Sequence, residues 1–157
     1  MDINNAVNDL LVKFMRSTPG IKQIMLSDVT GLIISKVTVE TGSQSDFEGF
    51  ASISTALYLG MSELKLGPLG LSLADFPENN LCLFGVTKEH VLIVITYKNV
   101  SIKKLKVSLK SLSDKISQQL DLWKAAEKIE TKQQEIIEKS VELSQEDYEK
   151  LLDELTF

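Results

Sequence analysis

The chain has 157 residues, which is enough for one domain with a sizeable core. Its 43% of hydrophobic and 25% of charged residues are typical of a globular protein and exclude a disordered one. A single cysteine, Cys82, excludes an internal disulfide and a cysteine-based metal cage, and it favours a reducing compartment.

The net charge of −5 is unevenly distributed. Residues 1–121 hold equal numbers of basic and acidic side chains, whereas residues 122–157 hold 5 lysines and 10 carboxylates. A neutral domain followed by an acidic segment has no overall footprint for nucleic acid. One local exception is the lysine-rich segment 98–115, which is either a solvated helix face or a patch for an acidic partner.

The N-terminal residues and the apolar runs indicate where the protein resides. The first residues break their apolar run with Asn, Asp and Lys, unlike a signal peptide. No apolar stretch approaches the roughly 20 residues needed to span a bilayer. We therefore expect a cytoplasmic protein that does not insert directly into a membrane.

The first elements are a helix and a hairpin. Apolar residues at spacings of three and four predict a helix from Ile3 that Pro19 and Gly20 stop. Two β-branched runs then flank the turn Asp28–Gly31. In such a turn the Asp accepts backbone hydrogen bonds and the Gly takes positive φ. A nucleotide loop would need a glycine-rich run with Lys-Ser or Lys-Thr opening a helix, and here a strand follows.

The second helix begins near Ser45 and carries two stripes. We expect one apolar face of Phe47, Phe50, Leu57, Met61 and Leu64. The other stripe consists of the small residues Gly49, Ser52, Ala56 and Gly60. Glycine inside a helix costs roughly 1 kcal/mol relative to alanine, so these glycines indicate that another backbone approaches closely. That backbone belongs either to the protein's own sheet or to another chain.

Three further strands follow. Residues 69–76, between Pro68 and Pro77, predict an edge strand on which Leu71 and Leu73 alternate with small residues. Residues 81–87 and 91–97 are nearly continuous apolar runs, as expected for central strands covered on both faces. Cys82 is then an inert buried residue. His90 is expected to be solvated in the turn between them.

The rest of the chain is predicted to be helical. Helix from Ser101 to Ser140 would be about 60 Å long, so it breaks near residues 130–135 or projects beyond the domain. A last, acidic amphipathic helix is expected to begin at Ser144. We expect it to dock on its own domain or on a neighbouring protomer, and to limit access to a partner surface. Its docking residues are Tyr148, Leu151, Leu152 and Leu155.

The sequence shows no set of residues for catalysis. The one histidine, His90, is expected in an exposed turn, where it would not serve a Ser-His-Asp triad, and no second histidine exists to share a metal. Neither a P-loop nor a dinucleotide fingerprint is present. Arg16 is the only arginine, so an arginine finger for phosphoryl transfer would have to be this residue. We expect a protein that is not an enzyme and has neither cofactor nor metal.

The order helix, two strands, helix, three strands, helix resembles the Roadblock/dynein light chain family from about Ile3 to Leu122. The resemblance is carried by "GIKQIMLSDVTGLIIS", by "FEGFASISTALYLGMSELKLG" and by "LCLFGVTKEHVLIVITYKN". It implies an α/β sandwich, a five-stranded antiparallel sheet with helices on both faces. The predicted domains are then residues 1–122, roadblock-like, and residues 123–157, an acidic helical extension.

The resemblance also implies a dimer, with itself or with a roadblock paralogue. In the family the third strands pair edge to edge, the second helices lie side by side, and the helix pair often forms the platform for a small Ras-like GTPase. The residues expected at the dimer or partner surface are Gly49, Ser52, Ile53, Ala56, Gly60, Leu71 and Leu73.

Three functions remain open on this reading. The first is a non-catalytic dimeric scaffold or regulator of a small GTPase, which could accelerate GTP hydrolysis without an arginine finger. The second is a structural light chain or trafficking adaptor that binds a larger protein through helical contacts. The third, a ligand-sensing domain, is disfavoured because the central strands are bulky and lack convergent polar residues.

Overall fold

The computed structural model of the chain describes residues 2–39 and 44–155, except for the side chains of residues 44, 45, 143, 144, 151, 154 and 155. The chain divides into two compact units, Met1–Gln119 and Leu120–Phe157. The elements run in the order α1 (Ile3–Ser17), β1 (Ile21–Asp28), β2 (Ile33–Thr38), α2 (Gln44–Ser62), β3 (Leu71–Asp75), β4 (Asn79–Thr87), β5 (His90–Tyr97) and α3 (Ile102–Leu155).

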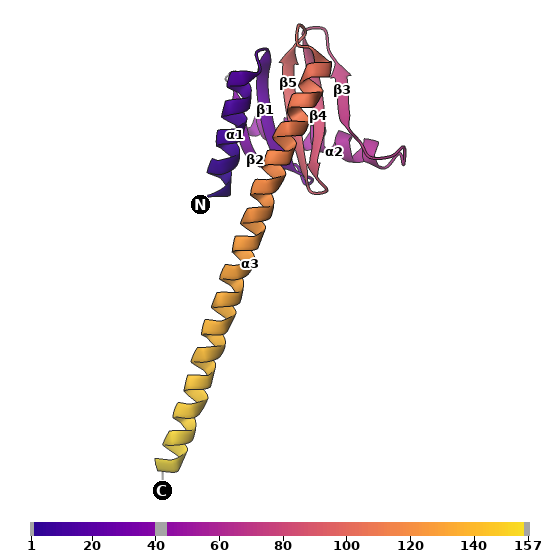
Figure 1. Cartoon of the computed structure of the whole chain (residues 1–157). Coiled ribbons are helices and arrows are strands. Elements are labelled where there is room, and N and C mark those ends of the chain that lie inside the picture. Colours follow the sequence, from indigo (N-terminus) through magenta and orange to yellow (C-terminus); the bar gives the residue numbers. More distant parts are fainter. Residues whose placement is uncertain (1, 40–43, 156–157) are drawn as a thin grey trace. The chain divides into compact units, whose positions relative to one another are not determined.

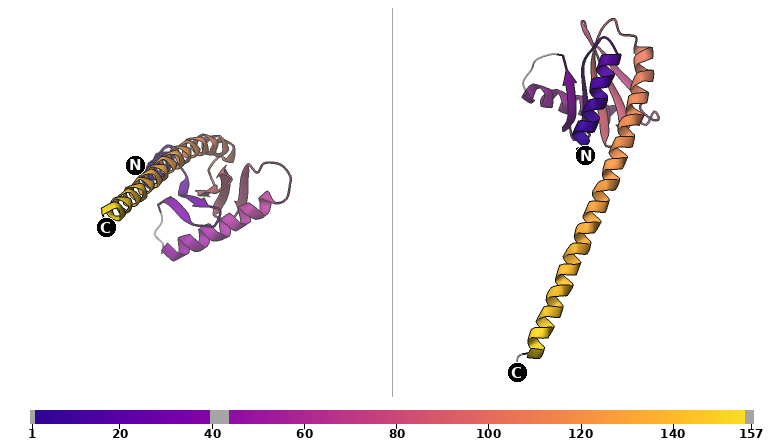
Figure 2. Two further views of the ribbon diagram at one scale, coloured as in Figure 1. Left: turned by 90° about the horizontal axis from the view of Figure 1, so that it is seen from below. Right: turned by 60° about the vertical axis from the view of Figure 1, so that its left-hand side comes forward.

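The five strands form one antiparallel sheet in the order β2-β1-β5-β4-β3. The two apolar runs of β4 and β5 lie inside the sheet, as predicted, and β3 is an edge strand, as predicted. Helix α2 covers one face, whereas α1 and the first turns of α3 cover the other (Figures 1 and 2). The predicted fold class, a five-stranded antiparallel sheet with helices on both faces, is confirmed.

Each face of the sheet has its own core. Toward α2 the core consists of Met25, Ala51, Leu81, Leu83, Val91 and Ile93. Alternate strand residues point to the opposite face. There α1 and α3 cover the buried residues of the strands. The buried apolar residues of the two helices include Val7, Leu11, Phe14, Leu105, Leu109, Leu112 and Ile116. Coverage on both faces explains why β4 and β5 read as almost uninterrupted apolar runs.

The segment Asp28–Gly31 is the hairpin turn that the sequence predicts. The Gly31 N–H donates to the Asp28 carbonyl oxygen at 3.0 Å, and Gly31 has a φ of 90°. A Cβ on Gly31 would also lie 2.8 Å from the Cα of Ser52. Gly31 is therefore required both by the turn and by the close approach of α2.

The apolar face predicted for α2 is wrong in two of its five residues. Phe47, Phe50 and Met61 pack against the core, but Leu57 is 46% exposed and Leu64 is 61% exposed. Small residues take their place on the inner side, where Ala51, Ser54 and Thr55 are almost fully buried. The helix is rotated so that its small residues, not only its large ones, contact the sheet.

The expectation of a separate last helix at Ser144 is also wrong. Helix α3 runs without interruption from Ile102 to Leu155, so Ser144 lies within it. The weak apolar stripe at residues 130–135 is not a stop signal, because the segment contains strong helix formers and neither glycine nor proline. Among the residues that the structure describes, no helix is long and apolar enough to cross a membrane.

The contact between Gly31 and α2 gives a test of the fold. We expect Gly31→Ala to lower the free energy of unfolding by about 2 kcal/mol or more, because a positive φ costs an alanine about 1–2 kcal/mol and Ser52 must also move. Gly67→Ala is the matched control, since Gly67 has a φ of 109° but no atom within 4 Å of the place that an alanine methyl group would take. Urea unfolding measures both variants. Equal losses would show that the approach of Ser52 adds no constraint.

Candidate functional site on α2 and β3

The outer face of α2 is an exposed surface of small and apolar residues. It consists of Gly49, Ser52, Ile53, Ala56, Leu57 and Gly60, all of which are exposed. Ile53 is 73% exposed, and a Cβ on Gly49 or Gly60 would meet no atom within 4 Å. The small stripe therefore does not pack on the protein's own sheet, although Ser52 also adjoins the turn at Gly31. That it contacts another chain stays a prediction.

This face also lacks charge. From Gly49 to Ser62 the helix contains no charged residue, whereas the other exposed helical faces are rich in lysine and carboxylate. Exposed apolar surface without charge is typical of the core of a protein interface. Small residues at the centre additionally allow a partner's backbone to come close.

Strand β3 places the second predicted part of the surface at the edge of the sheet. It pairs with β4 alone, which leaves its outer backbone groups without a strand partner in the described chain. An unpaired edge strand favours addition of a further strand. Leu71 pairs in register with Phe84 and Leu73 with Cys82, so both lie on the face of the sheet away from α2. Leu71 thus lies away from the small stripe of α2, whereas Leu73 also lines a cavity beside Leu57 of that helix.

Ser72 and Ala74 instead occupy the side of β3 that faces α2. Together with their neighbour Leu73 they line a small cavity of about 50 Å³, whose other lining residues are Leu57, Met61, Leu81 and Leu83. The hydroxyl of Ser72 is buried and has no hydrogen-bond partner in the described part of the chain. The cavity beside this hydroxyl is large enough to hold a water molecule.

Leu57 is the residue of this surface that the sequence analysis misplaced. It was assigned to the buried face, yet it lies at the junction of α2 with β3. Its position four residues after Ile53 places it on the same helical face, and that spacing is the signal that could have identified it.

The hairpin turn contains a carboxylate, that of Asp28, which accepts three hydrogen bonds. Asp28 Oδ1 accepts hydrogen bonds from Thr30 N at 2.8 Å, Thr30 Oγ1 at 2.6 Å and Leu32 N at 3.0 Å. Partial burial on its own would raise the pKa of Asp28, but these hydrogen bonds, with a contribution from the nearby His90, lower it overall. The carboxylate stabilises the turn by holding its backbone.

His90 and Cys82 are both buried. The expectation of a solvated His90 is wrong: it begins β5, is 9% exposed, and its Nδ1 lies 2.7 Å from Thr87 Oγ1. Cys82 is buried as predicted, and burial raises the pKa of its thiol to about 11. Within the described residues no three His, Cys, Asp or Glu side chains are grouped so that they could hold a metal ion.

The predicted docking residues of the C-terminal segment are described only in part. Tyr148 is 66% exposed and Leu152 is 47% exposed. The side chains of Leu151 and Leu155 lie outside the described residues. Docking of this segment stays a prediction.

Solved structures with the same fold are similar to this chain over about three quarters of its length. A Roadblock/LC7 domain from Streptomyces avermitilis has a TM-score of 0.64 at 15% identity, covering 72% of this chain and 96% of its own. The gliding protein MglB from Thermus thermophilus has a TM-score of 0.65 at 11% identity, with coverages of 76% and 91%.

An MglB in a tetrameric arrangement gives a TM-score of 0.66 at 10% identity, covering 76% of this chain and 90% of its own. No protein-family model matches the chain, and no curated protein matches it in sequence. The chain therefore has the roadblock fold, as the resemblance of its sequence implied.

The lowered pKa of Asp28 predicts a pH dependence of stability. Because the pKa is lower in the folded chain, the stabilisation is present above the unfolded pKa of about 3.9 and is lost as the pH falls through the folded pKa. We expect Asp28→Asn to lower the free energy of unfolding by about 1 kcal/mol at pH 7, and the difference from the native chain to shrink toward pH 2. Urea unfolding across this range measures it, with the exposed Glu78→Gln as control. A difference that stays constant with pH would contradict the assignment.

Proposed function

We propose that this protein is a dimeric, non-catalytic scaffold or regulator of a small Ras-like GTPase. The observation that carries the proposal is the uncharged, exposed outer face of α2 beside the unpaired edge of β3. A surface of this kind fits a protein partner rather than a small substrate, because it offers apolar area and backbone groups but no convergent polar groups.

Self-association is the first part of the proposal. Pairing of two β3 edges would extend the sheet across two protomers and satisfy backbone groups that are otherwise left to water. The same pairing would bring the two α2 helices alongside each other, where Gly49, Ala56 and Gly60 allow close contact. The tetrameric arrangement of a similar MglB supports self-association, either with a second copy or with a roadblock paralogue.

Binding of a GTPase is the second part. In the family that the sequence resembles, the pair of second helices forms the platform for the GTPase, which would place Ala56 and Gly60 beneath it. Arg16 lies in the last turn of α1, on the opposite side of the sheet from α2 (Figures 1 and 2). An arginine finger from the same protomer is therefore disfavoured, and any acceleration of GTP hydrolysis would reorganise the catalytic groups of the GTPase itself.

A structural light chain or trafficking adaptor is the alternative. It is favoured by the exposed apolar residues of the second unit, which lie along α3; they include Leu122, Ile129, Ile136, Ile137 and Val141. Such a helix can bind a larger protein by helix-in-groove contact. Binding that depends on the nucleotide state of a GTPase distinguishes the first function from the second.

The decisive experiment is a pulldown from the native cell extract with the full chain as bait. GDP is added to one sample and a non-hydrolysable GTP analogue to the other. Recovery of a small GTPase that depends on the nucleotide supports the proposed function. Recovery of one large protein in equal amounts under both conditions would favour the adaptor.

Self-association of the chain can be tested without a GTPase. We expect light scattering at micromolar concentration to give twice the 17.5 kDa mass of the chain. A monomer mass would contradict dimerisation through β3 and α2.

The outer face of α2 is tested by Gly60→Arg. Because a side chain at Gly60 meets no atom of its own protomer, the fold should be unchanged by circular dichroism while dimerisation or partner binding is lost. Gln118→Arg is the matched control, since Gln118 is an exposed helical residue of α3. We expect at least a tenfold weaker assembly for Gly60→Arg alone, which is the effect of about 1.4 kcal/mol. Unchanged assembly and unchanged binding would show that this face only contacts solvent.

A further inference from the structure

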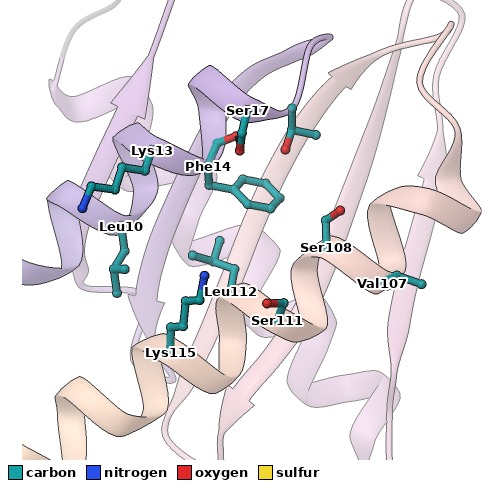
Figure 3. A pocket seen from close by; sticks show the side chains of 10 residues that line it. Leu10, Lys13, Phe14, Ser17, Val107, Ser108, Ser111, Leu112 and Lys115 are labelled. Atoms are coloured by element: carbon teal, nitrogen blue, oxygen red, sulfur yellow. Dashed lines mark hydrogen bonds between the residues drawn. The ribbon is translucent and has the colours of Figure 1, made fainter.

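A second surface lies on the other side of the sheet, between α1 and α3. A groove of about 480 Å³, the α1–α3 groove, has both helices as its walls; its lining residues are Leu10, Lys13, Phe14, Ser17, Thr18, Val107, Ser108, Ser111, Leu112 and Lys115. Phe14 and Leu112 point toward each other at its floor, and the side chain of Lys115 extends toward α1 (Figure 3). A second groove of about 410 Å³ adjoins it, because both are lined by Ser17, Thr18 and Ser108.

The chemistry of these grooves is cationic and hydroxylic. Lys13 and Lys115 line the first groove and Lys104 lines the second, and no carboxylate is among the lining residues of either. Ser108 and Ser111 add hydroxyl donors from α3. Apolar surface is present as well, because Val107 is 71% exposed at the rim. A groove with lysines, hydroxyls and an apolar rim fits an acidic amphipathic helix.

The chain itself contains such a helix in the tail segment, residues 141–155 of α3. This segment holds six carboxylates and one lysine, so its net charge equals the net charge of −5 of the whole protein. Val141, Gln145, Tyr148 and Leu152 recur at spacings of four, three and four, so they form one stripe. Val141 and Tyr148 are exposed, as are the carboxylates Glu142, Glu146, Asp147 and Glu149.

We propose that the α1–α3 groove binds the tail segment of a second copy of this chain. Complementary charge selects the partner, since lysines line the groove and carboxylates flank the apolar stripe of the tail segment. The second copy is favoured over the same copy because residues 107–115 and 141–155 belong to one continuous helix. A helix contacts itself only if it breaks.

The proposal is independent of the proposed GTPase function. The α1–α3 groove and the outer face of α2 lie on opposite sides of the sheet (Figure 2). A tail segment bound in the groove therefore leaves the outer face of α2 uncovered. This differs from the expectation from sequence that the tail limits access to a partner surface.

Cross-linking of two full-length variants tests the contact. One variant carries Ser111→Cys in the groove, and the other carries Gln145→Cys on the tail stripe; one of the two bears an affinity tag. A short bismaleimide is added to the mixture at pH 7. The native Cys82 remains unreactive because it is buried and its thiol pKa is about 11. We expect a covalent product that contains both variants and has twice the 17.5 kDa mass of the chain.

Reversing the charge of the groove lysines tests whether the tail segment binds in the α1–α3 groove. Lys13→Glu with Lys115→Glu should reduce the yield of the mixed product about tenfold, because two attractions become two repulsions. Lys106→Glu is the matched control, since Lys106 is an exposed lysine of α3 that does not line the groove. Adding Glu146→Lys with Glu149→Lys to the tail of the other variant should restore the yield. Circular dichroism establishes that all variants are folded.

Three outcomes would overturn the proposal. The first is an internal cross-link in a chain that carries both Ser111→Cys and Gln145→Cys, at concentrations where the mixture of single variants gives no product. The second is an equal loss for the groove reversal and for Lys106→Glu. The third is the absence of any mixed product. Failure of the GTPase pulldown would leave this result unaffected, because the two experiments probe opposite sides of the sheet.

Discussion

The close approach of α2 to the sheet is the constraint on which the other features depend. Two glycines make room for it. A Cβ on Gly31 would come within 2.8 Å of Ser52 Cα, and one on Gly85 would overlap the Tyr58 hydroxyl. On the helix side, Ala51 and Ser54 supply small buried residues. Large side chains such as Phe50 and Met61 still pack on this side, but the small buried residues between them leave Ile53 and Leu57 facing outward.

The sequence predicted that α2 is a helix, but it did not predict which face of that helix contacts the sheet. The strands, their order along the chain and the edge position of β3 follow from local signals: alternation, turn residues and flanking prolines. Which stripe of α2 faces the sheet depends on Gly31 and Gly85, which are distant in sequence. A rule that places the largest residues inside therefore misassigned Leu57 and Leu64.

The other two errors have equally specific causes. A new helix was expected at Ser144 from a capping pattern, although the residues before Ser144 contain neither glycine nor proline and continue the helix. His90 was assigned to a solvated turn, but β5 begins at this residue and Thr87 lies beside its ring. The α1–α3 groove could not be predicted at all, since it is formed by helices separated by most of the domain. Of its two lysines, Lys115 belongs to the segment 98–115 whose interpretation was left open, and Lys13 lies in the distant α1.

The two surfaces differ in symmetry, and this difference determines what each can assemble. The proposed pairing of β3 with β3 and α2 with α2 would be isologous, so every contact would occur twice about a two-fold axis and the assembly would close as a dimer. Burying Ile53 fully would contribute about 1.5–3 kcal/mol in each protomer, and the small residues around it add close contact rather than area.

Binding of a tail segment in an α1–α3 groove is heterologous, because two different surfaces meet. If two copies exchange tail segments reciprocally, the contact closes and reinforces a dimer. If each tail binds the groove of the next copy, the contact propagates and joins dimers into larger assemblies. The ionic part of this contact weakens with salt, since charges exposed to solvent are screened over about 10 Å at 0.1 M. The proposed apolar contact of α2 would not share that dependence, so a salt titration would distinguish the two modes of assembly.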